Sequence, residues 1–264
     1  MTFTLQRVYT FFNIPTGCLP FEVTGLWPPW GSPQGFFYFC GARPMAEAEP
    51  KKFNTVFLID GYNFFYSIKT LDPCVRWFDF KKFCQHFLTT HDLLSNIAYF
   101  TTVSERSPES AQRHRILIEA QEHNGIHVTF GEFKPKVHHC PYCDKTYNTP
   151  VEKITDVKIA LTAYRIASIK DVDKIIIVSG DTDLLPVFAM VKRDFPNKPI
   201  GVIFPLKRAP KQLQQIASFY HRTTEKLIYD CQLPDEIELK SGKKLTRPAK
   251  WTAAPKFFFV ASKL

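Results

Sequence analysis

Two short, almost entirely apolar segments constrain the fold more than any other feature of this sequence. Residues 55–59 read Thr-Val-Phe-Leu-Ile and residues 174–178 read Lys-Ile-Ile-Ile-Val, without alternation of apolar and polar side chains. Such runs are typical of strands buried on both faces, as in parallel sheets covered by helices. Segments with helical spacing separate them. This alternation predicts an α/β fold of three layers with a central, mostly parallel sheet.

Weaker patterns fill the chain around these two segments. Further strands are predicted at 97–103, 126–130 and 200–204, and helices at 78–94, 108–123, 152–169, 184–194, 210–217 and 223–229. Ser107 as the cap and Pro108 at the first helical position mark the start of one helix, and Gly125 marks its end. Residues 131–150 contain prolines and histidines and are expected to form a long loop.

The two ends of the chain differ from this pattern. Residues 1–44 place Pro and Gly between aromatic residues without a helical or strand period, and Met45 opens a polar stretch. We expect 1–44 to be an extension outside the domain, upstream of a true start at Met45; the alternative is an aromatic docking segment. The domain then spans 45–231. Residues 232–264 hold seven Lys/Arg against three acids and are expected to form an extended basic tail.

Composition narrows the classes of function. The chain has 34 Lys/Arg and 25 Asp/Glu, and its net charge of +9 favours polyanionic partners such as nucleic acid. Its seven cysteines do not follow the pattern of a disulfide framework, which favours a reducing compartment such as the cytoplasm. The last three residues, Ser-Lys-Leu, spell a peroxisomal address as an alternative. No membrane span or signal peptide is expected.

Acidic side chains follow both apolar strands. Asp60 comes directly after the first strand, and Asp181 and Asp183 follow the second. Because the carboxyl ends of parallel strands share one edge of a sheet, these side chains should lie on one rim. Glu152 and Asp156 are four residues apart and are expected on one helical face. Such a cluster favours oxygen ligation of Mg²⁺ or Mn²⁺; helix caps and solvated loop residues are the alternative.

Three motifs in order make the sequence recognisable. They are Asp60-Gly61-Tyr62-Asn63, Glu152-Lys153-x-x-Asp156 and Ser179-Gly180-Asp181-Thr182-Asp183. Together they resemble the NYN domain of the PIN-like nuclease superfamily, and most of all its LabA-like branch, over about residues 53–230. The resemblance implies a PIN-like Rossmannoid fold, a Mg²⁺ or Mn²⁺ site and, commonly, ribonuclease activity.

The resemblance also implies roles for individual residues. Asp60, Asp156 and Asp181 would be the metal carboxylates, Asp183 a fourth acid, and Asn63 a residue that orients a ligand or contacts the substrate. The implied mechanism is metal-assisted hydrolysis of a phosphodiester by a metal-activated water.

Cations near the ends of predicted loops are candidates for holding RNA. Arg106, Lys207 and Arg208 are expected to track the phosphate backbone beside the acidic cleft. Ordinary solubilising charge is the alternative for each of them.

A second informative stretch lies within the expected loop. Cys140 and Cys143 form a Cys-x-x-Cys pair, which is half of a tetrahedral zinc site, and His138 or His139 could supply a third ligand. The fourth ligand stays open, with the candidates His123, His127, Cys74, Cys84 and a second chain. A redox pair and two free thiols are the other interpretations.

The function predicted from the sequence is a divalent-metal-dependent nuclease, with RNA as its partner. The leading alternative is a non-catalytic nucleic-acid-binding or regulatory protein on the same fold. A small-molecule phosphatase is disfavoured, because Asp60-Gly61-Tyr62 stands where an aspartyl-phosphate mechanism would place Asp-x-Asp. The sequence leaves open whether the chain forms homo-oligomers.

Overall fold

The centre of the fold is a six-stranded sheet in the order β3–β2–β1–β6–β7–β8, in which every neighbouring pair is parallel. The computed structural model describes residues 52–105, 107–139 and 141–252. The strands are β1 (Phe53–Asp60), β2 (Asp92–Thr101), β3 (His127–Phe130), β6 (Lys174–Val178), β7 (Ile200–Phe204) and β8 (Tyr220–Arg222). The predicted α/β fold with a parallel sheet is confirmed.

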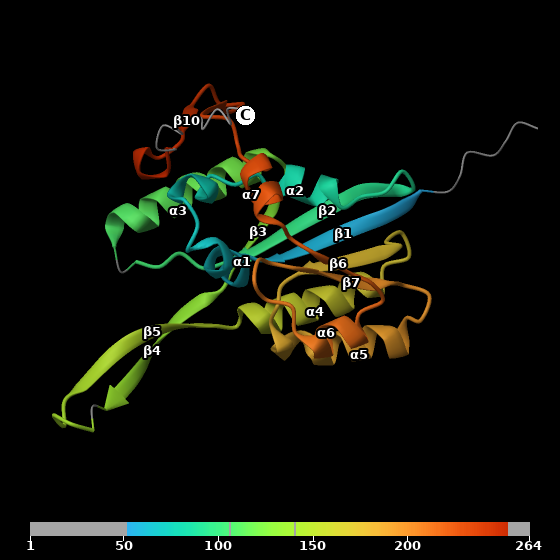
Figure 1. Cartoon of the computed structure of the whole chain (residues 1–264), viewed down its shortest axis with the longest axis horizontal. Coiled ribbons are helices and arrows are strands. Elements are labelled where there is room, and N and C mark those ends of the chain that lie inside the picture. The colour runs from blue at the N-terminus through green and yellow to red at the C-terminus, as the bar shows by residue number, and fades with distance from the viewer. Residues whose placement is uncertain (1–51, 106, 140, 253–264) are drawn as a thin grey trace, which may run out of the picture. The chain divides into compact units, whose positions relative to one another are not determined.

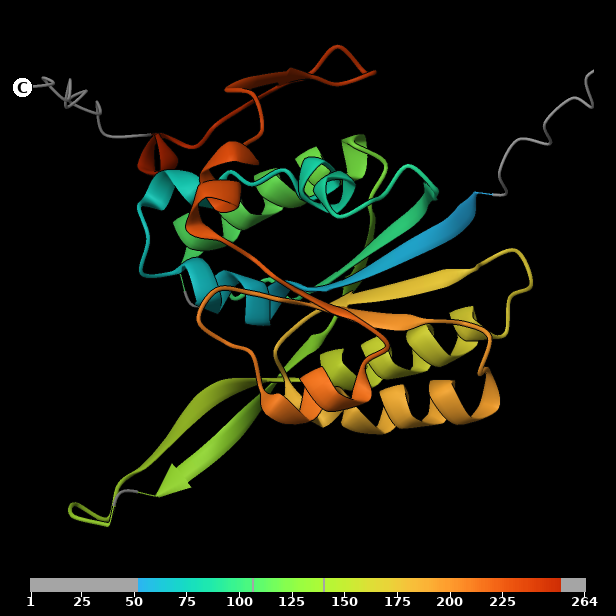
Figure 2. The same cartoon turned by 45° about the vertical axis from the view of Figure 1, so that its right-hand side comes forward.

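Helices cover both faces of this sheet, which completes the three layers (Figure 1, Figure 2). One face carries α1 (Gly61–Ile68), α2 (Phe80–His86), α3 (Pro108–His123) and α7 (Glu225–Asp230). The other face carries α4 (Thr155–Ala167), α5 (Leu185–Asp194) and α6 (Lys211–Ile216). The order of the strands reverses between β1 and β6, so the chain has its topological switch point there.

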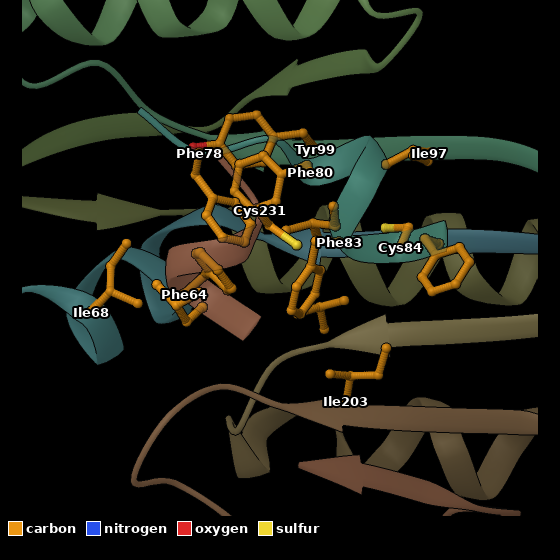
Figure 3. Close-up of a cluster of buried hydrophobic side chains, with 14 of the residues drawn as sticks. Phe64, Ile68, Phe78, Phe80, Phe83, Cys84, Ile97, Tyr99, Ile203 and Cys231 are labelled. Atoms are coloured by element: carbon orange, nitrogen blue, oxygen red, sulfur yellow. The ribbon is translucent and has the colours of Figure 1, made fainter. Parts of the chain in front are cut away.

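The central strand β1 is buried on both faces, as its sequence predicts. Its alternate side chains enter two separate clusters: Phe57 and Ile59 face α1 and α2, whereas Val56 and Leu58 face α4 and α5. Figure 3 shows the first cluster, in which aromatic rings pack together: Phe64 comes from α1, Phe80 and Phe83 from α2, and Phe78 from the segment before α2. The rings meet mostly edge to face, the arrangement that aromatic pairs prefer.

The segment between β3 and α4 is a hairpin rather than a loop, so the prediction for 131–150 is wrong. β4 (Glu132–His139) pairs antiparallel with β5 (Thr146–Lys153) and projects away from the sheet in both views (Figure 1, Figure 2). Pro135 and Pro150 lie opposite each other in this ribbon. Proline lacks an amide donor but is tolerated on edge strands. In a two-stranded ribbon both strands are edges, so the prolines do not exclude pairing.

The predicted helix over 152–169 starts three residues later than expected. α4 begins at Thr155, after Ile154 in a left-handed conformation with φ of 78°. Glu152 therefore belongs to β5 and does not share a helical face with Asp156, which corrects the prediction for that pair. The predicted helix over 78–94 is also too long, since α2 ends at His86 and β2 begins at Asp92.

The segment that follows α7 packs against the domain as far as Thr252, so the prediction of an extended tail over residues 232–264 is wrong for this part. It forms β9 (Glu236–Glu238), β10 (Lys244–Thr246) and the short 3-10 helix η3 (Ala249–Trp251). Trp251 is buried beside Trp77, with their ring centroids 6.5 Å apart. Leu233, Ile237, Leu245 and Trp251 of this segment are buried in one cluster with Trp77 and α3. The predictions for 1–44 fall outside the described residues.

None of the described helices is both long and apolar enough to cross a membrane.

Candidate active site at the carboxyl edge of the sheet

The two acid-bearing strand ends meet because β1 and β6 are neighbours in the sheet. The strands run parallel with Ile59 paired to Val178, so Asp60 and the segment from Ser179 onward leave the sheet at the same edge. This edge lies at the topological switch point, where open α/β sheets bind their ligands. The predicted rim therefore exists for Asp60, Asp181 and Asp183.

Asp60 is held firmly at this edge. Only 3% of the residue is exposed, and both oxygens of its carboxylate accept hydrogen bonds. Oδ1 accepts from the backbone N–H of Asn63 at 2.9 Å, which caps α1. Oδ2 accepts from the hydroxyl of Ser179 at 2.9 Å. A buried carboxylate needs such partners, and here they also fix its orientation.

Ser179 connects the two acidic segments. While its hydroxyl donates to Asp60, its Oγ accepts a hydrogen bond from the backbone N–H of Asp181 at 3.0 Å. Asp181 in turn accepts from the backbone N–H of Asp183 at 3.1 Å, and Asp183 itself is exposed. Ser179 opens the third sequence motif but was not among the predicted site residues, because hydroxyls in such turns usually cap helices; its place directly after a buried strand and before Asp181 was the available signal.

Asn63 makes a second link between the same two loops. Its side-chain carbonyl accepts a hydrogen bond from the backbone N–H of Gly180 at 3.0 Å. The contact with a substrate or ligand that the resemblance implied stays a prediction. In the structure, Asn63 connects α1 to the loop after β6 through this hydrogen bond.

Glycine is required at Gly61 by close packing. A Cβ atom added there would lie 2.5 Å from Cε2 of Tyr99 and 2.7 Å from the backbone oxygen of Phe100. Distances this short force atoms to shift, so only glycine lets α1 start directly against β2. The backbone approach places Asp60 and the start of α1 in contact with the neighbouring strand end.

Asp156 lies in the first turn of α4, directly after the hairpin β4–β5. The described residues contain no group of three or more His, Cys, Asp or Glu side chains placed to hold a metal ion. The structure thus does not gather Asp60, Asp156 and Asp181 into one set of ligands, and their role as ligands stays a prediction. Asp60 and Asp181 alone match what Mg²⁺ usually takes, namely one or two carboxylates with several retained waters.

Of the predicted RNA-binding cations, the structure brings Arg208 to the acidic edge. Its Cβ would lie 3.1 Å from a Cβ added at Gly180, so it packs over the backbone next to Asp181. Its side chain is exposed. Lys207 has a left-handed φ of 64° and its ammonium donates to the Thr70 hydroxyl at 3.2 Å, just beyond the end of α1. Arg106 lies outside the described residues.

The predicted zinc ligands belong to the tip of the hairpin. Cys143 is an exposed free thiol, whereas Cys140 and the side chain of His138 lie outside what the structure describes. His139 approaches Asp144 there at 3.1 Å. Cys74 and Cys84 are excluded as the missing ligands, because both are buried in the core between the sheet and α2. Zinc binding at the tip stays a prediction.

The fold and this edge define a class of protein. An α/β fold with an all-parallel sheet and carboxylates at the switch point matches the PIN-like Rossmannoid fold. The model of the NYN domain family matches residues 54–223, and the chain belongs to that family within the PIN-like nuclease superfamily.

Two individual proteins show partial similarity. The curated protein 6-hydroxy-3-succinoylpyridine 3-monooxygenase HspA of Pseudomonas putida is 33% identical over 110 residues, which are 39% of this chain and 34% of that protein. The chain thus spans about a third of the length of that relative. A crystal structure of a protein of unknown function from Vibrio parahaemolyticus is 21% identical, with a TM-score of 0.44 over 68% of this chain and 97% of its own.

Proposed function

We propose that this protein is a divalent-metal-dependent ribonuclease whose reaction takes place at the carboxyl edge of β1 and β6. One observation carries the proposal: in an NYN domain, Ser179 joins the buried carboxylate of Asp60 to the loop of Asp181 at the switch point. A buried, doubly hydrogen-bonded carboxylate at a ligand-binding edge is costly to maintain, which favours a functional role over a purely structural one.

The residues at this edge have distinct parts in the proposed reaction. When bound, Mg²⁺ or Mn²⁺ would polarise the scissile phosphate and lower the pKa of a water molecule. Asp60 and Asp181 would hold that ion, and the Ser179 hydroxyl and the Asn63 backbone keep the Asp60 carboxylate in one orientation. Asp156, in the first turn of α4, and Asp183, two residues after Asp181, would supply the further acids.

RNA as the substrate is supported by charge as well as by family. The net charge of +9 favours a polyanion, and the exposed Arg208 packs beside the acidic loop where a phosphate backbone would pass. We place this activity in the cytoplasm, since the seven cysteines of the sequence do not follow the pattern of a disulfide framework, as expected in a reducing compartment.

The test is cleavage of labelled RNA by the full chain in Mg²⁺ and then in Mn²⁺, compared with Asp181→Asn. Loss of a proposed ligand should lower the rate by about 100-fold or more, beyond the about 10–100-fold that loss of an outer partner costs. Asp171→Asn is the matched control, because this exposed residue precedes β6 at the opposite edge of the sheet. Equal rates for the two variants would contradict the proposal.

A non-catalytic RNA-binding protein is the second candidate, favoured by the finding that the described residues hold no group of three metal-binding side chains. In that case RNA would bind without metal-dependent cleavage, and Asp181→Asn would leave the affinity for RNA unchanged.

A further inference from the structure

A cavity opens beside the candidate active site, on the β2 side of Asp60. It lies between α1, the carboxyl end of β2 and α3, and Gly61, the residue after Asp60, forms part of its wall. Its volume is about 150 Å³. Pockets that enclose a whole drug-sized ligand measure about 300–1,000 Å³, so this one encloses only part of such a ligand, on the scale of one nucleobase. The rest of a larger ligand would remain outside, toward the edge.

The charge of this cavity is positive. Arg76 and Arg113 line it, and its lining includes no carboxylate. No ion pair joins either arginine to another described residue, and the Nε atom of Arg76 is buried without a hydrogen-bond partner among them. Burial lowers the pKa of His114, which also lines the cavity, to about 4. The two arginines therefore carry the positive charge at neutral pH, and a buried unpaired guanidinium nitrogen indicates a missing anionic partner.

Aromatic rings form much of the remaining wall. Tyr62, Phe65 and Tyr66 come from α1, and Tyr99 comes from β2. Phe65 is 39% exposed, and the Arg76 guanidinium lies over its ring at 5.8 Å from the centroid. Stacked aromatic and guanidinium groups are the means by which proteins hold nucleobases without reading their sequence. The hydroxyls of Ser104 and Ser110 add polar groups to the same wall.

We propose that this cavity binds one nucleotide unit, with its base against the Phe65 and Tyr62 rings and its phosphate on Arg76 and Arg113. Two arginines in the wall call for an anion, the aromatic rings call for a planar group, and the volume is on the scale of one nucleobase. A nucleotide combines these properties. Read with the proposed ribonuclease function, on which this part rests, the cavity would seat a nucleotide of the substrate strand next to Asp60. A free mononucleotide has the same chemistry and is the other source of the ligand.

The test measures nucleotide binding in EDTA, where metal-dependent cleavage is absent. The result therefore tests the cavity even if the protein is not a nuclease. Adenosine 5′-monophosphate and a short labelled single-stranded RNA are titrated separately, at one fixed salt concentration. Arg113→Gln should weaken binding about tenfold or more, because a hydrogen-bonded charge pair is lost. Arg115→Gln is the matched control: it lies on the same helix, does not line the cavity and pairs with Glu105.

A second variant tests the base. The wild-type protein should bind adenosine 5′-monophosphate roughly tenfold more tightly than ribose 5-phosphate, because only the former has a ring to stack. Phe65→Leu keeps an apolar side chain at this partly exposed position and should abolish most of that preference. An unchanged preference would contradict the placement of the base.

The two arms also identify the source of the ligand. If Arg113→Gln weakens the binding of both ligands, the cavity is a site for free nucleotides as well as for nucleotides within a strand. If it weakens the binding of RNA alone, the cavity holds a nucleotide within a strand. Equal affinities of Arg113→Gln and Arg115→Gln for both ligands would overturn the proposal, even if cleavage of RNA is intact. Binding that depends on Arg113 in a protein without metal-dependent cleavage would overturn the ribonuclease instead.

Discussion

At the scale of single residues, the site depends on two uncharged residues, Ser179 and Gly61, whose positions are closely constrained by their neighbours. Ser179 is completely buried and uses one hydroxyl to donate to Asp60 and to accept from the Asp181 backbone. Gly61 is confined by Tyr99 and the Phe100 carbonyl, so no larger residue fits between α1 and β2. Neither residue carries charge, yet both determine where the carboxylates lie.

His114 gives a prediction about pH at this scale. Its imidazole contacts the Thr101 hydroxyl at 3.2 Å, and burial lowers its pKa from 6.5 to about 4. The unfolded chain therefore binds a proton between these values while the folded chain does not, so stability is retained above pH 6.5 and falls toward pH 4. Between pH 7.5 and pH 5 this group should cost about 2 kcal/mol in the free energy of unfolding.

The measurement is urea unfolding at both pH values for the wild type and for His114→Gln, which keeps a polar side chain but does not titrate. The wild type should lose about 2 kcal/mol more than the variant on acidification. Equal losses would show that His114 titrates normally in the folded protein.

At the scale of elements, the segment after α7 behaves as part of the domain. Trp251 packs at a tilt beside Trp77, whose indole N–H donates to the Pro234 carbonyl at 2.7 Å, and Leu233 and Leu245 are buried with them. The segment thus packs against α3 and against Trp77, which lies between α1 and α2, and forms a small hydrophobic core with them.

Trp251→Ala should therefore destabilise the whole domain and not only its end. Removing a buried Trp side chain costs about 3–5 kcal/mol, partly because a cavity remains. Urea unfolding of the full chain measures this loss, and the exposed neighbour Lys250→Ala is the control, expected within about 0.5 kcal/mol of the wild type. A Trp251 variant as stable as the control would mean that the segment is a detachable tail.

At the scale of the whole molecule, the two edges of the sheet have different tasks. The carboxyl edge holds Asp60 and Asp181, whereas the opposite edge holds an ion pair between Lys174 at the start of β6 and Asp92 at the start of β2. Burial raises the pKa of Asp92, but hydrogen bonds from Lys174 and Thr89 outweigh it and lower the pKa overall. Strand β1, about 25 Å long at eight residues, separates the two sites.

Lys174→Met should consequently lower stability without changing the reaction. Its loss leaves the Asp92 carboxylate without its cation but with hydrogen bonds from Thr55 and Thr89, and losing a charged hydrogen bond of this kind costs about 1–3 kcal/mol. The expected result is a lower urea midpoint with the same rate of RNA cleavage per folded molecule. Lys170→Met, exposed in the loop before β6, should change neither quantity. A change of rate without a change of stability in Lys174→Met would contradict this division between edges.

Most of the central fold was predictable, because apolar runs such as 174–178 and 200–204 admit few other arrangements. The same runs place Asp60, Asp181 and Asp183 at strand ends, so their shared edge followed from parallel pairing. The hairpin β4–β5 was not predictable in this way, since Pro135 and Pro150 are normally signals against a strand. They are accepted there only because the ribbon has no further neighbours in the sheet.

The sequence by itself determined the class of fold, the family motifs and the edge at which the acids gather. Periodicity and strand ends are local properties, and local patterns report them directly. Only the tertiary structure decided that Ser179 joins Asp60 to Asp181, that Trp251 packs on Trp77, and that Arg76 and Arg113 line one cavity. These contacts join residues far apart in the chain, and their geometry depends on the packing of whole elements, which no local pattern encodes.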